Sequence, residues 1–158
     1  KVVAEAVRLK KEDARAAHAK RDAGDVYDEV WCVINVDAHA TLPAALDEAA
    51  REGISVAVNG PCFEVWLILH AEDHRAALSS SRNAKERWRS TAREHALDPT
   101  AFEALIKKLP EALHRADDLD AMHHRNGIPR VQRNPSTEVH LLLRQLERRS
   151  GIDLTTAV

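Results

Sequence analysis

The chain has 158 residues, of which 44% are hydrophobic and 30% charged, with a formal net charge of -2 at pH 7. This composition is typical of a globular protein and excludes a disordered chain, and the charge gives no overall attraction to nucleic acid, although a local basic surface stays open. No apolar stretch approaches the roughly 20 residues of a membrane span, and two cysteines make no disulfide framework, so we expect a cytoplasmic protein.

The first half of the chain alternates helical and strand patterns. Residues 1–21 are amphipathic, as in a surface helix. "EVWCVIN" (29–35) and "ISVAV" (54–58) are nearly continuous apolar runs, which predicts strands covered on both faces, the second ending at the turn residues "NGP". "ATLPAALDEAAREG" between them predicts a helix with Pro43 in its first turn, and another helix follows Pro61. Two buried strands joined in this way predict a parallel, right-handed βαβ unit.

Beyond residue 75 the pattern is helical. "SSSRNAKERWRSTAREHAL" opens with serine caps, and "DPTAFEALIKKL" opens with an aspartate cap and ends before Pro110, where "PEALHRADDLDAMHHR" continues. "NGIPRVQRNPS" predicts a loop, and "STEVHLLLRQLERRSG" predicts a closing helix with Ser136 as its cap and Gly151 after its end. We therefore expect an α/β core over residues 1–75 and a helical region over 76–158. Four apolar residues at helical spacing should pack the closing helix on the core: Val139, Leu142, Leu143 and Leu146.

Polar side chains follow both predicted strands. The stretch "INVDAH" (34–39) has polar side chains at alternate positions, Asn35, Asp37 and His39. Glu64 lies in the first turn of the helix after the second strand. Parallel strands deliver their following loops to one edge of the sheet, where ligands bind in open α/β folds. Oxygen ligands of this kind suit Mg²⁺ or Mn²⁺. The alternative is that Asp37 caps the following helix and that Glu64 is only a favourable first-turn acid.

Three stretches of the sequence together resemble the RloB-like family of bacterial proteins from restriction and phage-defence loci. They are "YDEVWCVINVDAH", "GISVAVNGPCFEVWLILHAED" and "NPSTEVHLLLRQL", which cover residues 27–73 and 134–146 in the order and spacing of the family. The resemblance implies a Toprim-like, Rossmann-like parallel core with a helical C-terminal part. It also implies a metal-dependent nuclease that acts on DNA or RNA in anti-phage defence, often beside a partner ATPase of the AAA or ABC type. A homodimer is left open.

The resemblance also suggests individual site residues. Toprim-type nucleases use a glutamate after their first strand and an Asp-x-Asp pair after a later strand. Asp37 matches the second acid of that pair, Asn35 stands in place of the first, and Glu64 matches a glutamate on the family's helix. We therefore expect Asn35, Asp37 and Glu64 to bind Mg²⁺ or Mn²⁺, with Asp37 and Glu64 as catalytic residues that position the metal and its water.

Departures from the family pattern favour a different function. The amide of Asn35 carries no charge, and the family's first strand with its glutamate is expected before Lys1. Asn59 and the glycine after it also stand where the family usually has Ser-Asn. The alternative is therefore a catalytically degraded interaction module that binds a partner ATPase or nucleic acid.

Basic residues offer phosphate contacts. Arg130 and Arg133 lie in the loop before "NPST", where they can neutralise a scissile phosphate, and we count Arg133 among the catalytic residues. Other basic residues can follow a phosphate backbone, although charged helical faces are usually only solvated. These are Arg82, Lys85, Arg87, Arg89 and Arg125.

Three further residues have functional and structural interpretations. His70 and His74 have an i, i+4 spacing that suits zinc on one helix face, but the HExxH order is missing, so we predict a structural role. Cys62 lies near a helix N-terminus, where a thiol pKa can fall, yet no catalytic partner pattern accompanies it.

The sequence also lacks GxGxxG and GxxxxGK patterns, which disfavours a nucleotide-binding Rossmann domain.

Overall fold

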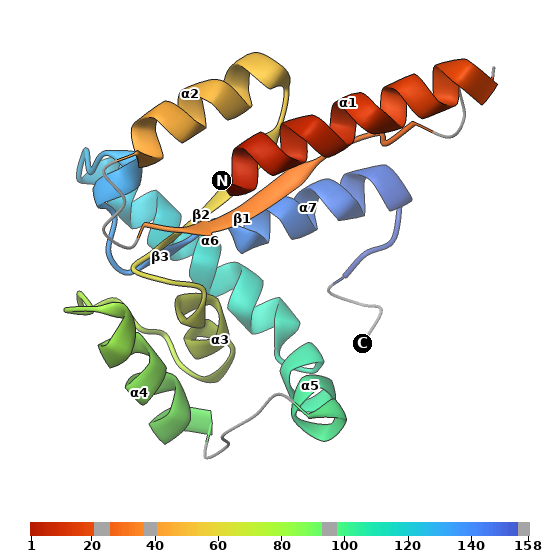
Figure 1. Ribbon diagram of the computed structural model, residues 1–158. Helices are drawn as coiled ribbons and strands as arrows, with labels where there is room; N and C mark the ends of the chain where they lie inside the picture. The colour runs from red at the N-terminus through yellow and green to blue at the C-terminus, as the bar shows by residue number, and fades with distance from the viewer. Residues whose placement is uncertain (21–25, 37–40, 93–97, 155–158) are drawn as a thin grey trace. The chain divides into compact units, whose positions relative to one another are not determined.

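The computed structural model describes residues 1–20, 26–36, 41–92 and 98–154 (Figure 1). Within these ranges no helix is both long and apolar enough to cross a membrane. Helices and strands are both present, which confirms the α/β class. In chain order the elements are α1 (Val2–Lys20), β1 (Trp31–Asn35), α2 (Leu42–Glu52), β2 (Ser55–Gly60), α3 (Glu64–Ala71), α4 (Ser81–Ala92), α5 (Pro99–Ile106), α6 (Leu109–Arg125), the 3-10 helix η2 (Arg130–Gln132), β3 (Ser136–Thr137) and α7 (Val139–Ser150).

The strands form one sheet in the order β1-β2-β3. The Ser55 N–H donates to the carbonyl of Val30 (2.9 Å) and the Val36 N–H to that of Asn59 (2.8 Å). Because the bonded positions rise together along both strands, β1 and β2 are parallel, as predicted. The unexpected strand β3 runs antiparallel to β2, with Thr137 opposite Asn59. The sheet is therefore mixed, and the Toprim-like form of the core stays a prediction.

Two predicted boundaries at this sheet are wrong for the same reason. The "NGP" turn was expected to end the second strand, but β2 continues through Gly60 because Ser136 pairs with it. Ser136 was expected to cap the closing helix. It lies in β3 instead, and its hydroxyl donates to the carbonyl of Arg133 (3.0 Å). Non-local strand pairing overrides the local turn and cap signals here.

The chain divides into two compact units. Unit 1 comprises Lys1–Ile34 and Ala38–Ala57, and unit 2 comprises Asn35–Asp37 and Val58–Val158. Strand β2 passes from one unit into the other. The division into domains at residue 75 stays a prediction.

Unit 1 packs α1 against α2. Gly53 ends α2 in the left-handed conformation (φ 63°), as its place after the helix predicts. The Lys10 ammonium donates to the carbonyls of Glu52 and Gly53 (2.9 Å each), so a cation from α1 binds the C-terminal end of α2. Strand β1 is not covered on both faces, because Val33 is 42% exposed. The buried core consists of Val3, Ala6, Cys32, Ala49 and Ile54.

Unit 2 is built around α3, which packs against α4 and α6. All its residues from Val65 to His70 are buried, and the partly buried Trp88 of α4 contacts two apolar clusters beside it. Helix α7 contributes Val139 and Leu143 to this core, but Leu146 is 51% exposed, so the predicted apolar face is buried only in part.

Candidate functional site

The carboxyl ends of β1 and β2 are joined by the hydrogen bond from the Val36 N–H to the Asn59 carbonyl (2.8 Å). This bond lies within unit 2 and fixes the residue before Asp37 beside the end of β2. Asn35 is exposed, and the partly exposed Glu64 begins α3 four residues after β2 ends. Asp37 and His39 lie outside the described residues, so the proximity of Asp37 to Glu64 stays a prediction.

The side chain of Asn59 has a structural role at this edge. Asn59 is fully buried, and its amide oxygen accepts a hydrogen bond from the hydroxyl of Thr137 (2.7 Å). The Thr137 hydroxyl oxygen in turn accepts from the N–H of Val139 (3.3 Å), the first residue of α7. This chain of hydrogen bonds connects β2, β3 and α7.

Glu138 follows β3 and binds both backbone groups of Val58. Its own N–H donates to the Val58 carbonyl (3.1 Å), and its carboxylate accepts from the Val58 N–H (2.8 Å). Arg130 donates to the same carboxylate from Nε (2.8 Å) and from Nη2 (2.6 Å), a contact that raises the pKa of the guanidinium. The Glu138 side chain is only 9% exposed, so the carboxylate of this bidentate ion pair is largely shielded from water. Sequence reasoning gave Glu138 no role, although it lies in the stretch "NPSTEVHLLLRQL".

Arg133, a predicted catalytic residue, is engaged with protein groups. Its Nη1 donates to the Asp120 carboxylate (2.6 Å) and its Nε to the carbonyl of Ile128 (3.2 Å). The side chain is 11% exposed, and these contacts hold the loop before β3 to α6. Its catalytic role stays a prediction that requires the guanidinium to leave Asp120.

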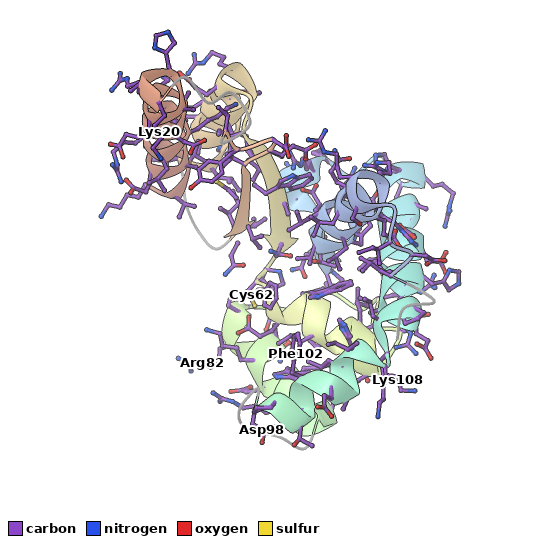
Figure 2. The ribbon with its side chains drawn as sticks, turned by 90° about the vertical axis from the view of Figure 1, so that its right-hand side faces the viewer. Lys20, Cys62, Arg82, Asp98, Phe102 and Lys108 are labelled. Atoms are coloured by element: carbon purple, nitrogen blue, oxygen red, sulfur yellow. The ribbon has the colours of Figure 1, made fainter. Side chains whose placement is uncertain are left out.

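The basic residues of α4 differ in their surroundings. Arg87 binds the carboxylate of Glu72 through Nε (2.6 Å) and Nη2 (2.8 Å), and this contact lowers the pKa of Glu72. Arg82, labelled in Figure 2, and Lys85 and Arg89 are exposed. They leave a basic surface on α4 for which a nucleic-acid contact stays a prediction.

His70 and His74 do not share a helix face, so the i, i+4 spacing read from the sequence is not realised in the structure. Helix α3 ends at Ala71, and Glu72 is extended, so His74 lies beyond the helix that carries His70. Among the described residues there is no group of three or more histidine, cysteine, aspartate and glutamate side chains arranged to hold a metal ion. The predicted magnesium site needs Asp37, which is not among them.

Cys62 is fully buried before α3. Burial raises the pKa of its thiol to about 11, and a hydrogen bond with Glu64 adds to the effect. The thiol is therefore protonated at neutral pH, which agrees with the structural role predicted for it.

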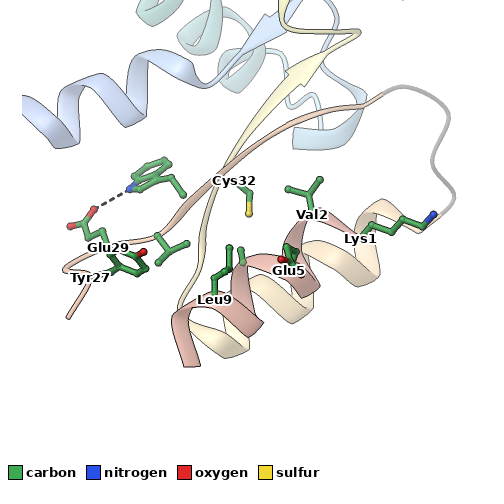
Figure 3. Close-up of a pocket in the computed structure, with 10 residues that line it drawn as sticks. Lys1, Val2, Glu5, Leu9, Tyr27, Glu29 and Cys32 are labelled. Atoms are coloured by element: carbon green, nitrogen blue, oxygen red, sulfur yellow. Dashed lines mark hydrogen bonds between the residues drawn. The ribbon is translucent and has the colours of Figure 1, made fainter. Parts of the chain in front are cut away.

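Unit 1 has an open, mostly apolar groove of about 670 Å³ between α1 and β1 (Figure 3). Figure 3 shows Val2 and Leu9 of α1 pointing toward the strand that carries Cys32. Val2 is 56%, Leu9 45% and the neighbouring Tyr27 58% exposed. A contiguous apolar surface of this kind is typical of a protein contact.

Two buried histidines in unit 2 predict a loss of stability in mild acid. Burial lowers the pKa of His70 and of His140, although Asp117, Asp120 and Glu138 raise that of His140 in opposition. Below about pH 6.5 these histidines bind protons in the unfolded chain but remain neutral in the folded chain. The free energy of unfolding should therefore fall as the pH drops below about 6.5.

The measurement is urea unfolding at pH 7.5 and 5.5. His140→Gln should reduce the difference between the two pH values, whereas His114→Gln, at a side chain that is 77% exposed, should leave it unchanged. A wild-type protein that is equally stable at both pH values would contradict this prediction.

Comparison with known proteins gives one match. A family model described as RloB-like protein matches residues 1–146. No curated protein and no solved structure matches the chain. The match includes all three stretches on which the sequence resemblance rests.

Proposed function

Because the chain belongs to the RloB-like family, we propose that it is a metal-dependent nuclease of a bacterial anti-phage defence system. The observation that carries this proposal is the hydrogen bond from Val36 to Asn59 (2.8 Å), which ties the segment leading to Asp37 to the end of β2. Glu64 is the first residue of α3, four residues after β2 ends.

The donor set at this edge fits a hard divalent cation. Asn35 offers an amide oxygen and Glu64 a carboxylate, and both are accessible to solvent. With Asp37 they would hold Mg²⁺ or Mn²⁺, which when bound supplies an activated water and stabilises negative charge on the phosphate. The N-terminus of α3 favours an anion near Glu64. Arg133 would add a positive charge only after exchanging Asp120 for the phosphate.

Calorimetric titration of the full-length protein with Mn²⁺ tests the site. Asp37→Asn and Glu64→Gln should each weaken Mn²⁺ binding by at least about tenfold, because each removes a charged ligand. Glu103→Gln, at an exposed position on α5, removes the same charge elsewhere and should leave binding unchanged. The two site variants should also lose cleavage of DNA or RNA, and the substrate cleaved by the wild type identifies the nucleic acid. Equal affinities of all four proteins would end the proposal.

The alternative function is a catalytically degraded interaction module that binds a partner ATPase or nucleic acid. It is supported by the uncharged Asn35 and by the open groove of unit 1, with its exposed Val2, Leu9 and Tyr27. Asn35→Asp separates the two functions. In a metal site the added charge should strengthen Mn²⁺ binding by roughly tenfold, since ligand charge sets the affinity of such sites. If neither this variant nor the wild type binds Mn²⁺, the protein is better described as an interaction module than as a nuclease.

A further inference from the structure

A second hollow, of about 270 Å³, lies within unit 2 at the C-terminal end of α3. Its wall includes His70 from α3, Trp88 from α4, Leu105 from α5 and Arg115 from α6. Lys108, labelled in Figure 2, lies at the junction of α5 and α6. Small-molecule pockets usually span about 300–1,000 Å³, so this one suits only a small ligand. Glu64 is at the opposite end of the eight-residue α3, so the hollow is separate from the proposed metal site.

His70 presents an unused hydrogen-bond acceptor. It is only 6% exposed, and its Nδ1–H donates to the Trp66 carbonyl (2.9 Å), a contact that fixes the tautomer because a carbonyl oxygen can only accept. The ring stands edge-on to Trp66, with centroids 4.7 Å apart. Burial lowers the pKa of His70, so its Nε2 carries a lone pair at neutral pH. No hydrogen bond to this nitrogen is found among the described residues, although the side chain lines the hollow.

Arg115 presents a cation that makes no direct ion pair among the described residues, although Glu72 is near enough for their charges to interact. Its Nη1 donates to the Leu69 carbonyl (2.7 Å), and none of the ion pairs among the described residues includes it. The second cation, Lys108, is held loosely, with its ammonium 3.9 Å from the Glu111 carboxylate. A partly buried guanidinium that is not directly paired with a carboxylate can bind an anion through two parallel N–H groups.

We propose that this open hollow binds a small organic phosphate monoester such as a nucleoside monophosphate, of which it encloses the phosphate and part of the organic group. Arg115 and Lys108 contact the phosphate, and His70 Nε2 accepts a hydrogen bond from a ligand hydroxyl or a protonated phosphate oxygen. Trp88 and Leu105 cover the organic part, because an aromatic and an aliphatic side chain offer it an apolar surface. A fully deprotonated anion without a donor would face the His70 lone pair, so the donor is part of the recognition.

The first test is calorimetric titration of the full-length protein with 5′-AMP, adenosine and inorganic phosphate. The 5′-AMP should bind, and adenosine and phosphate should each bind at least about tenfold more weakly, because each lacks one half of the recognised group. Arg115→Gln should weaken 5′-AMP binding by about tenfold or more, as expected for charge-assisted hydrogen bonds. The control is Arg148→Gln, which removes the same charge from an exposed position on α7 and should leave the affinity unchanged.

Failure to bind 5′-AMP at millimolar concentration would overturn the proposal. So would equal losses in Arg115→Gln and Arg148→Gln, or adenosine binding as tightly as 5′-AMP. Glu64→Gln must leave 5′-AMP binding unchanged, because a loss there would place the ligand at the proposed metal site instead. Mn²⁺ binding and 5′-AMP binding can thus fail independently.

A second readout follows His70 itself. In the wild-type protein the ¹⁵N resonance of His70 Nε2 should shift on addition of 5′-AMP, as a lone pair becomes hydrogen bonded. His70→Asn retains a donor for the Trp66 carbonyl and removes Nε2, so it should weaken binding about three- to tenfold. An unchanged Nε2 resonance at saturating 5′-AMP would exclude His70 from the site even if the variant failed to fold.

Discussion

Glu138→Ala should lower the free energy of unfolding by about 2–4 kcal/mol, less than for a fully buried ion pair because the Arg130 side chain is 43% exposed. Two separate losses contribute. The Val58 N–H, now bonded to the carboxylate at 2.8 Å, would have no partner there, and Arg130 would lose its bidentate acceptor. Urea unfolding measures the change. Glu86→Ala, at an exposed position on α4, should change stability by less than about 0.5 kcal/mol.

Variants of the same pair separate its two contributions. Glu138→Gln keeps an oxygen for the Val58 N–H and loses the charge, so its effect should be intermediate. Arg130→Gln should cost less than Glu138→Ala, because the Arg130 side chain is 43% exposed and solvent replaces part of what it loses. If Arg130→Gln destabilises the protein as much as Glu138→Ala does, the bond to Val58 contributes nothing.

The parts of the fold that the sequence predicted have local causes. Helix α2 has Pro43 in its first turn and ends at Gly53 with a positive φ, as its sequence indicates. Helix α5 begins where the Asp98 carboxylate accepts from the N–H of Ala101 (2.8 Å). Pro110 lies in the first turn of α6, which separates this helix from α5. Each of these signals acts within one helical turn, so it can be read without knowing the tertiary contacts.

The parts that the sequence missed depend on residues far apart in the chain. Strand β3 has two residues and no alternation, and it exists because the Thr137 hydroxyl and backbone meet Asn59, 78 positions earlier. Asn134 behaves similarly, because its side-chain amide bonds both the N–H (3.1 Å) and the carbonyl (2.7 Å) of Leu78. No local pattern marks either contact.

At the candidate site, too, the features with local causes were predicted and those that depend on distant residues were missed. Parallel strands β1 and β2 follow from the βαβ pattern, and the bond from Val36 to Asn59 confirms that their carboxyl ends adjoin. The expectation of a free phosphate-binding Arg133 came from its loop position alone. Its carboxylate partner, Asp120, lies 13 residues earlier on α6 and becomes a neighbour only through the fold.

Gly60→Ala should lower the free energy of unfolding by about 2–3 kcal/mol, the cost of forcing an extra group into a packed interior. A Cβ at this position would collide with the carbonyl oxygen of Arg133 and lie 2.8 Å from the Ser136 hydroxyl oxygen. The backbone cannot yield cheaply, because Gly60 pairs with Ser136 in the sheet and the Ser136 hydroxyl is bonded to the same Arg133 carbonyl. The glycine is therefore required by a close approach of two chain segments and not by a positive φ.

Gly127→Ala is the matched control for this prediction. Gly127 has a φ of 64°, but nothing lies within 4 Å of where its Cβ would be, so alanine there has only the backbone strain to overcome, about 1–2 kcal/mol. Urea unfolding of the two variants should rank Gly60→Ala as the more destabilised protein, and serine at position 60 should be at least as harmful as alanine. Equal losses would mean that the Arg133 carbonyl can move away from β2. The contact between the end of β2 and the loop before β3 would then be adjustable, and Arg133 would be freer to leave Asp120 for a phosphate than its present hydrogen bonds indicate.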